Sequence, residues 1–510
     1  QLNRDQKNFS IVMWLFIMMG IALVVYFNTS PSEPRERDYV YAGSFYAFSI
    51  WIGLGVLAVR DALARLTKRN GVAIALTATA ICAVVPTVLA TENWDDHDRS
   101  HRYVARDIGS NYLESTLPNS IILNFGDNDT FPLWYNQEVE GVRHDVKVMN
   151  MSYLGAEWYI DQMRIRSNNA APVPFTLPRE KYTYCNELVP IVNRFERPVD
   201  LADVIDFVAS EDRHSKVQMS DGSWNDYIPA RILALPVNKE NALASGIVSE
   251  KDAHLMVDTV YISISEGKDH IEKAELMFLD MLAHFDWKRP IYFTQIYSLQ
   301  KFGLLPYLQF DGYSYRLVPI FTPLSSHNNV IGRIDTDYTY PLMMEKFRYG
   351  NIADERVYVD GFVTYNLNVA HARDSFAALA KQLVAEGDKE RAHKALDAAV
   401  ERLPFTQLEY SELSTLPIIE GYYEAGGEEK ADAILRDYAR QLIEHIDYYA
   451  RFDGNKQSLV DPVLDEKLET YEVLYMTAAR YGRREIVAEM NDFYRSIGVE
   501  ENDLIRLTAE

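Results

Sequence analysis

The pattern of apolar and polar positions begins with three uncharged apolar runs, at Phe9–Phe27, Tyr39–Val59 and Gly71–Ala90. A helix needs about 20 apolar residues to cross the hydrocarbon core of a bilayer, and each run is close to that length. A cleaved signal peptide does not fit, because two further apolar runs follow the first and no small-residue cleavage pattern separates them. Residues 1–90 are therefore predicted to form three transmembrane helices, the end of a polytopic membrane bundle.

The basic residues that flank these runs predict their orientation. The link between the second and third runs is the more basic, with Arg60, Arg65, Lys68 and Arg69. The link 28–38 carries only Arg35 and Arg37, which three acidic residues offset. Because lysine and arginine concentrate in cytoplasmic links, we expect the second link to be cytoplasmic. Everything after Ala90 is then expected on the extracytoplasmic (periplasmic) side of the inner (cytoplasmic) membrane.

Strand and helix patterns alternate in the next region, residues 91–330. Ile121–Phe125 and Val146–Met151 read as short buried strands, and Phe131–Val139 between them has helical spacing. Strand, helix and strand within about thirty residues indicate a parallel sheet. The other predicted elements are the helices Arg102–Ser115, Leu154–Arg164 and Ile271–His284 and the strands Thr259–Ile264 and Pro290–Thr294. We expect an α/β domain with a mainly parallel sheet; its stretch 165–250 is irregular and receives no elements.

A purely helical pattern follows a predicted linker at 331–361 and covers residues 362–510. One apolar face recurs at helical spacing, at Phe376, Leu379, Ala380, Leu383 and Val384, and a second at Ala392, Leu396, Ala399, Val400 and Leu403. Gly387 separates the two faces, and a glycine turn followed by a helical pattern recurs near Gly427 and Gly482. This pattern is typical of degenerate tetratricopeptide-like repeats, with a plain helical bundle as the alternative.

Charge and cysteine content narrow the class of protein. The chain has 51 Lys and Arg against 74 Asp and Glu, a net charge of −23. Such an acidic surface repels phosphate backbones, so nucleic acid is not an expected partner. The two cysteines, Cys82 and Cys185, lie in chemically different segments and cannot form a disulfide framework.

The most polar cluster directly follows the third apolar run, in the sequence ENWDDHDRSHR at 92–102. Its candidate ligand-binding residues are Asp95, Asp96, His97, Asp98, Arg99 and Arg102. Carboxylates and imidazole suit divalent cations, and arginine suits phosphate, so a metal or phosphate-headgroup site is one interpretation. The alternative is that Asp95–Asp98 cap and charge the start of the following helix.

A second cluster, Gly126–Thr130 (GDNDT), directly follows the strand Ile121–Phe125. Ligands of parallel α/β sheets bind beyond the carboxyl ends of strands. Asp127 and Asp129 form a D-x-D pair that can hold a metal against a diphosphate, whereas Asp129 or Thr130 could equally cap the next helix. Trp134 is a candidate platform for a sugar ring or a core residue. The sequence has no glycine-rich phosphate loop, no H-E-x-x-H and no G-x-S-x-G.

Four segments carry a resemblance to a known group: EPRERDYVYAGSFYAF (33–48), NWDDHDRSHRY (93–103), GDNDTFPLWYNQEVEGVRHDVKVMN (126–150) and WYIDQMR (158–164). They resemble bacterial polytopic membrane proteins that are protein O-mannosyltransferase-like members of the glycosyltransferase C superfamily. The resemblance implies a polyprenyl-phosphate sugar donor and a protein or glycan acceptor. The catalytic acid of the superfamily lies in a membrane bundle ahead of this region. No catalytic residue is therefore assigned, and the chain is expected to be the C-terminal, acceptor-side or scaffold part of such an enzyme.

Two other classes of function compete with the glycosyltransferase interpretation. One is a membrane-anchored binding or assembly module of the cell envelope, whose helical repeats hold a protein partner. The other is a metal-dependent hydrolase that uses Asp95, His97, Asp127 and Asp129, a spacing that matches no hydrolase motif. The sequence alone identifies no cofactor, metal, sugar or oligomeric state.

Overall fold

The computed structural model describes residues 5–28, 37–183, 188–324, 330–360, 369–408 and 410–496. The chain divides into two compact units, Gln1–Asp98 and Arg99–Glu510. Arg35, Cys185 and the expected start of the helical region at Phe362 lie outside the described residues.

The first unit confirms the three apolar helices. The spans Gln6–Phe27, Asp38–Thr67 and Val72–Glu92 are each long and apolar enough to cross a membrane. They consist of α1 (Gln6–Met18), α2 (Ile21–Phe27), the 3-10 turn η1 (Asp38–Tyr41), α3 (Ala42–Thr67), α4 (Val72–Cys82) and α5 (Val84–Glu92), followed by α6 (Trp94–His97). Pro86 has no N–H to donate to the carbonyl of Cys82, which is where α4 ends.

Apolar side chains cover the surface of this unit. Trp14 is 62% exposed and Val25 is 74% exposed, a degree of apolar exposure that suits lipid rather than water. Inside the unit, the rings of Phe9 and Trp51 stack with their centroids 5.6 Å apart. The hydroxyl of Ser44 donates to the carbonyl of Phe16 over 2.8 Å, so α1 and α3 are joined by a polar contact as well as by apolar packing.

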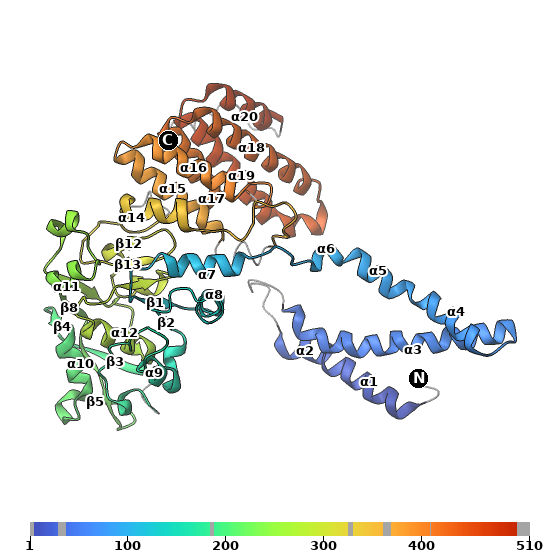
Figure 1. Cartoon of the computed structure of the whole chain (residues 1–510), viewed down its shortest axis with the longest axis horizontal. Helices are drawn as coiled ribbons and strands as arrows, with labels where there is room; N and C mark the ends of the chain where they lie inside the picture. The colour runs from blue at the N-terminus through green and yellow to red at the C-terminus, as the bar shows by residue number, and fades with distance from the viewer. Residues whose placement is uncertain are drawn as a thin grey trace. The chain divides into compact units, whose positions relative to one another are not determined.

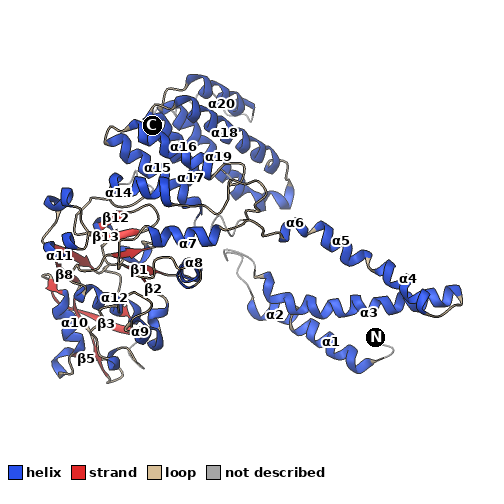
Figure 2. Cartoon of the chain, viewed as in Figure 1, coloured by secondary structure: helices blue, strands red, loops and turns tan. Residues whose placement is uncertain are grey.

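The second unit begins with the α/β region, drawn from cyan to yellow in Figure 1 and holding all the strands coloured in Figure 2. Its α-helices are α7 (Val104–Glu114), α8 (Asp127–Glu138), α9 (Glu157–Met163), α10 (Leu201–Ala209), α11 (Lys239–Ala244), α12 (Lys273–His284), α13 (Tyr297–Gln300) and α14 (Thr336–Pro341). Its strands are β1 (Ile121–Asn124), β2 (Lys147–Asn150), β3 (Leu188–Phe195), β4 (Val199–Asp200), β5 (Lys216–Gln218), β6 (Trp224–Asp226), β7 (Ile228–Ala230), β8 (Ile232–Pro236), β9 (Thr259–Ser263), β10 (His270–Glu272), β11 (Ile291–Phe293), β12 (Leu308–Phe310) and β13 (Tyr315–Leu317). Short 3-10 turns lie at Tyr153–Gly155 (η2), Arg179–Lys181 (η3), Arg213–Ser215 (η4), Glu250–Leu255 (η5) and Leu305–Tyr307 (η6).

The central sheet has five strands in the order β12-β13-β11-β1-β2. β1 runs parallel to both of its neighbours, with Ile121 opposite Ile291 of β11 and Lys147 of β2. β13 pairs antiparallel with β11 and β12, so the sheet is mixed. All three parallel strands were predicted, and they confirm the α/β class; the antiparallel strands come from 308–317, where no strand was predicted. Smaller sheets join β10-β3-β7, β4-β8-β9 and β5-β6.

Both faces of this sheet are buried at β1, whose side chains alternate between two hydrophobic cores. Ile122 belongs to a core that also contains residues of α7 and α15, whereas Ile121 and Leu123 belong to a second core with α12. Successive residues of a strand point to opposite faces, and a run without polar residues is therefore what a strand covered on both sides requires. The short apolar run of the sequence is explained by this double burial.

Several element boundaries differ from the predictions; the helix predicted at Leu154–Arg164, for example, is the turn η2 followed by α9 from Glu157. The helix predicted from Phe131 begins four residues earlier, at Asp127, with Gly126 as its N-cap. The helix predicted at Ile271–His284 begins as strand β10 and becomes α12 at Lys273. The helix predicted from Arg102 begins at Val104 with Tyr103 as its N-cap, so the interpretation of Asp95–Asp98 as its caps is wrong.

The stretch 331–361, expected to be a linker, contains α14 and a π-helical turn, η7 (Leu342–Lys346). Met343, Phe347 and Tyr349 are buried in the core that also contains residues of α7 and α15. The described part of this stretch therefore packs as part of the second compact unit.

The C-terminal region of the second unit is helical, as predicted. Its helices are α15 (Val369–Ala385), α16 (Lys389–Arg402), α17 (Glu412–Ala425), α18 (Glu428–Tyr449), α19 (Gln457–Arg480) and α20 (Arg484–Ser496), with a 3-10 turn η9 at Gly454–Lys456. Gly387, Gly426 and Gly482 have φ angles of 86°, 88° and 69° and lie between the paired helices, a backbone conformation that favours glycine. The turn predicted at Gly427 is therefore made by its neighbour Gly426.

Candidate functional site

The carboxyl ends of the parallel strands place three loops along one edge of the central sheet. Phe125 and Gly126 follow β1, Met151 and Ser152 follow β2, and Thr294 follows β11. Because parallel strands end at the same edge, these loops come together although they lie up to about 170 residues apart in the sequence. This edge of the sheet is therefore the expected position of a ligand site.

Asp129 joins two of these loops. Its carboxylate accepts the backbone N–H of Gly126 (2.8 Å) and of Phe125 (3.1 Å), and the hydroxyl of Thr294 donates to it over 2.6 Å. Asp129 is the third residue of α8, and its bond from the N-cap residue Gly126 is half of a capping box. The prediction that Asp129 itself is the N-cap is wrong, because the helix starts before it. Both of its oxygens are occupied by protein donors.

Asp127 has a different environment from Asp129. It is exposed, and the hydroxyl of Tyr153 donates to its Oδ1 over 2.8 Å. This hydrogen bond raises the pKa of Tyr153 above its ordinary value. The two members of the D-x-D pair therefore have separate partners. Across the described parts of the chain, no three His, Cys, Asp or Glu side chains form a group that could hold a metal ion.

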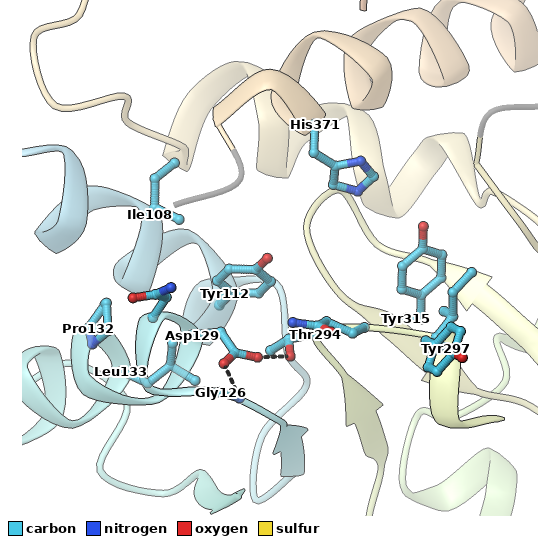
Figure 3. Close-up of a pocket in the computed structure, with 13 residues that line it drawn as sticks. Ile108, Tyr112, Gly126, Asp129, Pro132, Leu133, Thr294, Tyr297, Tyr315 and His371 are labelled. Carbon is cyan, nitrogen blue, oxygen red and sulfur yellow. Dashed lines mark hydrogen bonds between the residues drawn. The ribbon is translucent and has the colours of Figure 1, made fainter. Parts of the chain in front are cut away.

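A cavity of 480 Å³, here called the β1–β11 pocket, opens at this edge. Its residues come from α7, the β1–α8 turn, the segment after β11, strand β13 and α15: Ile108, Tyr112, Gly126, Asn128, Asp129, Pro132, Leu133, Thr294, Gln295, Ile296, Tyr297, Tyr315 and His371. Figure 3 shows His371 on one side of the cavity and Asp129 with Thr294 on the other. The tyrosine rings provide apolar surface, and the amide and hydroxyl groups provide hydrogen bonds.

The electrostatics of the β1–β11 pocket favour uncharged side chains. Burial lowers the pKa of His371 to about 4, so its imidazole is neutral at pH 7. Asp374, one helical turn further along α15, has an Oδ2 atom 4.0 Å from Nδ1 of His371, and burial raises its pKa to about 7. Burial also raises the pKa of Tyr315 above its ordinary value. The carboxylate of Asp129 is the one charged group among the side chains that line the pocket, and protein donors occupy it.

Sequence patterns identified only part of this pocket. Asp129 was a candidate, and the predicted strand Pro290–Thr294 was a usable signal for Thr294, because it ends at the same edge as Ile121–Phe125. His371 and Tyr315 carried no signal, since one lies in a helix that reads as core and the other in an unpredicted strand. Trp134 is half-buried, packs against both cores and is not among the lining residues.

The predicted cluster at 92–102 is divided between the two compact units. Asp95, His97 and Asp98 lie exposed at the end of the first unit, and Nδ1 of His97 is 2.8 Å from the carbonyl oxygen of Asn93. The side chain of Asp96 lies outside the described residues.

The two arginines of this cluster belong to the second unit. The guanidinium of Arg99 lies 4.9 Å from the ring centre of Tyr358, and Arg102 pairs with Asp360 over 3.4 Å. Both contacts hold the start of the second unit against the stretch 351–360. The role of the cluster as a set of binding residues stays a prediction.

The fold and the pocket define a class of protein: a chain with apolar helices suited to a membrane, a mixed-sheet α/β region with a pocket at its carboxyl edge, and a helical C-terminal region. Residues 105–338 match the family model described as TMEM260-associated domain 2. The match runs from α7 into α14 and includes every residue that lines the pocket except His371. No solved structure matches the chain.

Proposed function

We propose that this chain is the acceptor-side part of an O-mannosyltransferase-like membrane protein, and that the β1–β11 pocket binds a neutral sugar residue. The observation that carries the proposal is the chemistry of the pocket, in which tyrosine rings and neutral hydrogen-bonding groups surround a cavity of 480 Å³. Sugar rings stack on aromatic faces through their C–H groups and exchange hydrogen bonds through their hydroxyl groups. The match of residues 105–338 supports the proposal, because TMEM260 is described as O-mannosyltransferase-like.

In such an enzyme, a membrane bundle would carry out the chemical step and the region of this chain would bind the acceptor. The sugar is transferred from a polyprenyl-phosphate donor to a protein or glycan outside the cytoplasm, and the chemical step belongs to a membrane bundle. In this division the β1–β11 pocket holds a sugar of the acceptor or product, and the helical region α15–α20 provides surface for the protein that carries it.

The orientation in the membrane follows from the basic link at 60–70. Arg60 and Arg65 lie towards the C-terminal end of the second apolar helix, Asp38–Thr67, and Lys68 and Arg69 directly follow it. All four are proposed to be on the cytoplasmic side. Fusing a reporter at Lys68 and another at Asp98 tests this directly. We expect a cytoplasmic signal from the first and a periplasmic signal from the second, and the reverse pattern would contradict the proposal.

Sugar binding is tested on the purified chain in detergent micelles, with methyl α-mannoside and a mannosylated peptide as probes. Saturation-transfer NMR should detect both probes with the wild-type chain. Gln295→Ala removes an exposed polar group of the pocket and should weaken the signals severalfold. The matched control is Gln300→Ala, an exposed glutamine five residues further on that does not line the pocket.

Two results would count against sugar binding in the β1–β11 pocket. One is the absence of saturation transfer to either probe with the wild-type chain. The other is an equal loss in Gln295→Ala and Gln300→Ala, which would place the binding elsewhere. A chain that binds the peptide without its mannose just as well would favour the binding-module alternative.

A further inference from the structure

A second cavity lies at the same edge of the sheet and has a different charge pattern. This α12 pocket has a volume of 500 Å³ and is lined by Phe125, Met151, Ser152, Gly155, Leu188, Glu272, Lys273, Ala274, Glu275, Tyr297, Ser298 and Lys301. It meets the β1–β11 pocket at Tyr297, which lines both.

Lys273 is the unusual residue of the α12 pocket. It is the first residue of α12 and is only 5% exposed, yet it makes no hydrogen bond or ion pair with any described residue. Lysine is almost never buried to this degree without a partner for its charge. The ammonium nitrogen itself is not among the buried unpaired atoms of the described residues, so the stem of Lys273 is buried while its charged end reaches the cavity. Since the side chain of Lys273 lines the cavity, the missing partner can enter from that cavity.

The helix on which Lys273 lies adds to the positive potential. α12 has 12 residues, and its N-terminus is at the pocket, where Lys273, Ala274 and Glu275 form its first turn. The N-terminus of a helix carries about half a positive charge and favours anions. The N-terminus of α12 and the unpaired ammonium group of Lys273 are independent observations that point to the same kind of ligand.

Two acidic residues of the pocket, Glu272 and Glu275, lie at the same end of α12 and form its capping box. Glu275 is paired with Lys268 over 2.9 Å and accepts the backbone N–H of Glu272 over 2.9 Å. Glu272 and Lys301 also line the pocket, and both side chains are exposed. With Glu275 paired to Lys268, the lining leaves the two lysines Lys273 and Lys301 against the one carboxylate of Glu272.

We propose that the α12 pocket binds a small anionic group, a phosphate monoester or a carboxylate, through Lys273 and the N-terminus of α12. The hydroxyl groups of Ser152 and Ser298 lie in the same lining and can donate hydrogen bonds to an anionic oxygen. The proposal concerns a different cavity from the proposed sugar site and does not depend on it.

The experiment is equilibrium dialysis of the full chain in detergent micelles with radiolabelled inorganic phosphate or acetate at constant ionic strength. The wild-type chain should bind one of these anions saturably, and the anion bound more tightly identifies the source as phosphate or carboxylate. Lys273→Met should weaken the affinity about tenfold or more, because it removes the charge of the one lysine in the lining whose side chain is mostly buried and held in place. Its matched control is Lys389→Met, which changes the first residue of α16 where that lysine is exposed and should leave the affinity unchanged.

Lys301→Met provides a variant that does not depend on a change in the protein interior. Lys301 is exposed at the pocket, so this variant should fold like the wild type and bind the anion severalfold more weakly. The proposal is overturned if the wild-type chain binds neither anion saturably, or if folded Lys273→Met binds as tightly as the control. If Lys273→Met does not fold, an unchanged affinity in Lys301→Met overturns it instead.

Discussion

The β1–β11 pocket and the α12 pocket lie at the same edge of one sheet and share Tyr297. They differ in charge, because the first presents neutral groups to a ligand and the second presents an unpaired lysine. In the first, protein donors occupy the carboxylate of Asp129, and burial keeps His371 neutral. In the second, the ammonium group of Lys273, a residue that is only 5% exposed, faces the cavity without a partner among the described residues. The comparison shows that the carboxyl edge of a sheet determines where a site forms. What the site can bind depends on whether each charged side chain is already paired with another protein group.

The largest effect should come from Asp129, because it joins the loops that form the floor of the β1–β11 pocket. Asp129→Ala leaves the N–H groups of Phe125 and Gly126 and the hydroxyl of Thr294 without an acceptor. At about 1 kcal/mol for each lost hydrogen bond, the free energy of unfolding should fall by about 3 kcal/mol. Chemical denaturation followed by circular dichroism measures the change.

The matched control for this prediction is Asp127→Ala. Asp127 is exposed and has one hydrogen bond, from Tyr153, so its loss should hardly change the midpoint of unfolding. If the two variants were equally stable, Asp129 would not be the residue that holds the loops together. If Asp127→Ala alone abolished ligand binding, the exposed carboxylate rather than the pocket would be the functional group.

The neutrality of the β1–β11 pocket predicts a pH dependence with two opposing parts. His371 has a pKa of about 4 when folded and about 6.5 when unfolded, so it adds stability as the pH rises between these values. Asp374 has a pKa of about 7 when folded and about 3.9 when unfolded, so the stability it contributes falls as the pH rises between these values. In the wild-type chain the two parts nearly cancel between pH 5 and 6.5.

Single substitutions should separate the two parts. Asp374→Asn leaves only the contribution of His371, and its free energy of unfolding should rise by about 2 kcal/mol from pH 5 to 6.5. His371→Leu leaves only the contribution of Asp374 and should lose about the same amount over that range. Denaturation curves at several pH values measure both slopes. Parallel slopes in the two variants would show that these groups are not buried as the structure has them.

A smaller effect is expected at Tyr297, the residue that the two pockets share. Tyr297→Ala should weaken binding of methyl α-mannoside about tenfold, or about 1.4 kcal/mol, because the ring provides apolar surface for a sugar. Binding of phosphate should change little, since a neutral ring does not compensate a negative charge. Tyr261→Ala, which removes a partly exposed tyrosine of β9 outside both pockets, is the control. Equal weakening of both ligands would mean that the two pockets act as one.

Much of the fold could be predicted from local patterns. The apolar runs that became β1, β2 and β11 are short and uninterrupted because both faces of the sheet are buried, and the glycine turns of α15–α20 carry positive φ angles. The start of α8 was misplaced because Gly126 serves as its N-cap, a position for which the sequence also offered Asp129.

The candidate sites were less predictable, because they depend on contacts between distant segments. Asp129 stood out as part of a D-x-D pair, but its role follows from Thr294, which lies 165 residues further on. His371 reaches the pocket from a helix whose sequence reads as core, and Lys273 looks like any lysine at the start of a helix. Burial and the lack of a partner, which set Lys273 apart, are properties of the folded chain.

The central claim is that two chemically distinct pockets lie at one edge of the sheet. Measuring the binding of a sugar and of an anion to the same set of variants tests it most directly. Affinities for methyl α-mannoside and for inorganic phosphate are measured on the wild-type chain, His371→Leu and Lys273→Met at pH 7 and constant ionic strength. The account predicts that His371→Leu loses the sugar and keeps phosphate, and that Lys273→Met loses phosphate and keeps the sugar. Loss of both ligands in either folded variant, or of neither in both, would contradict the assignment of two chemically distinct pockets to this edge of the sheet.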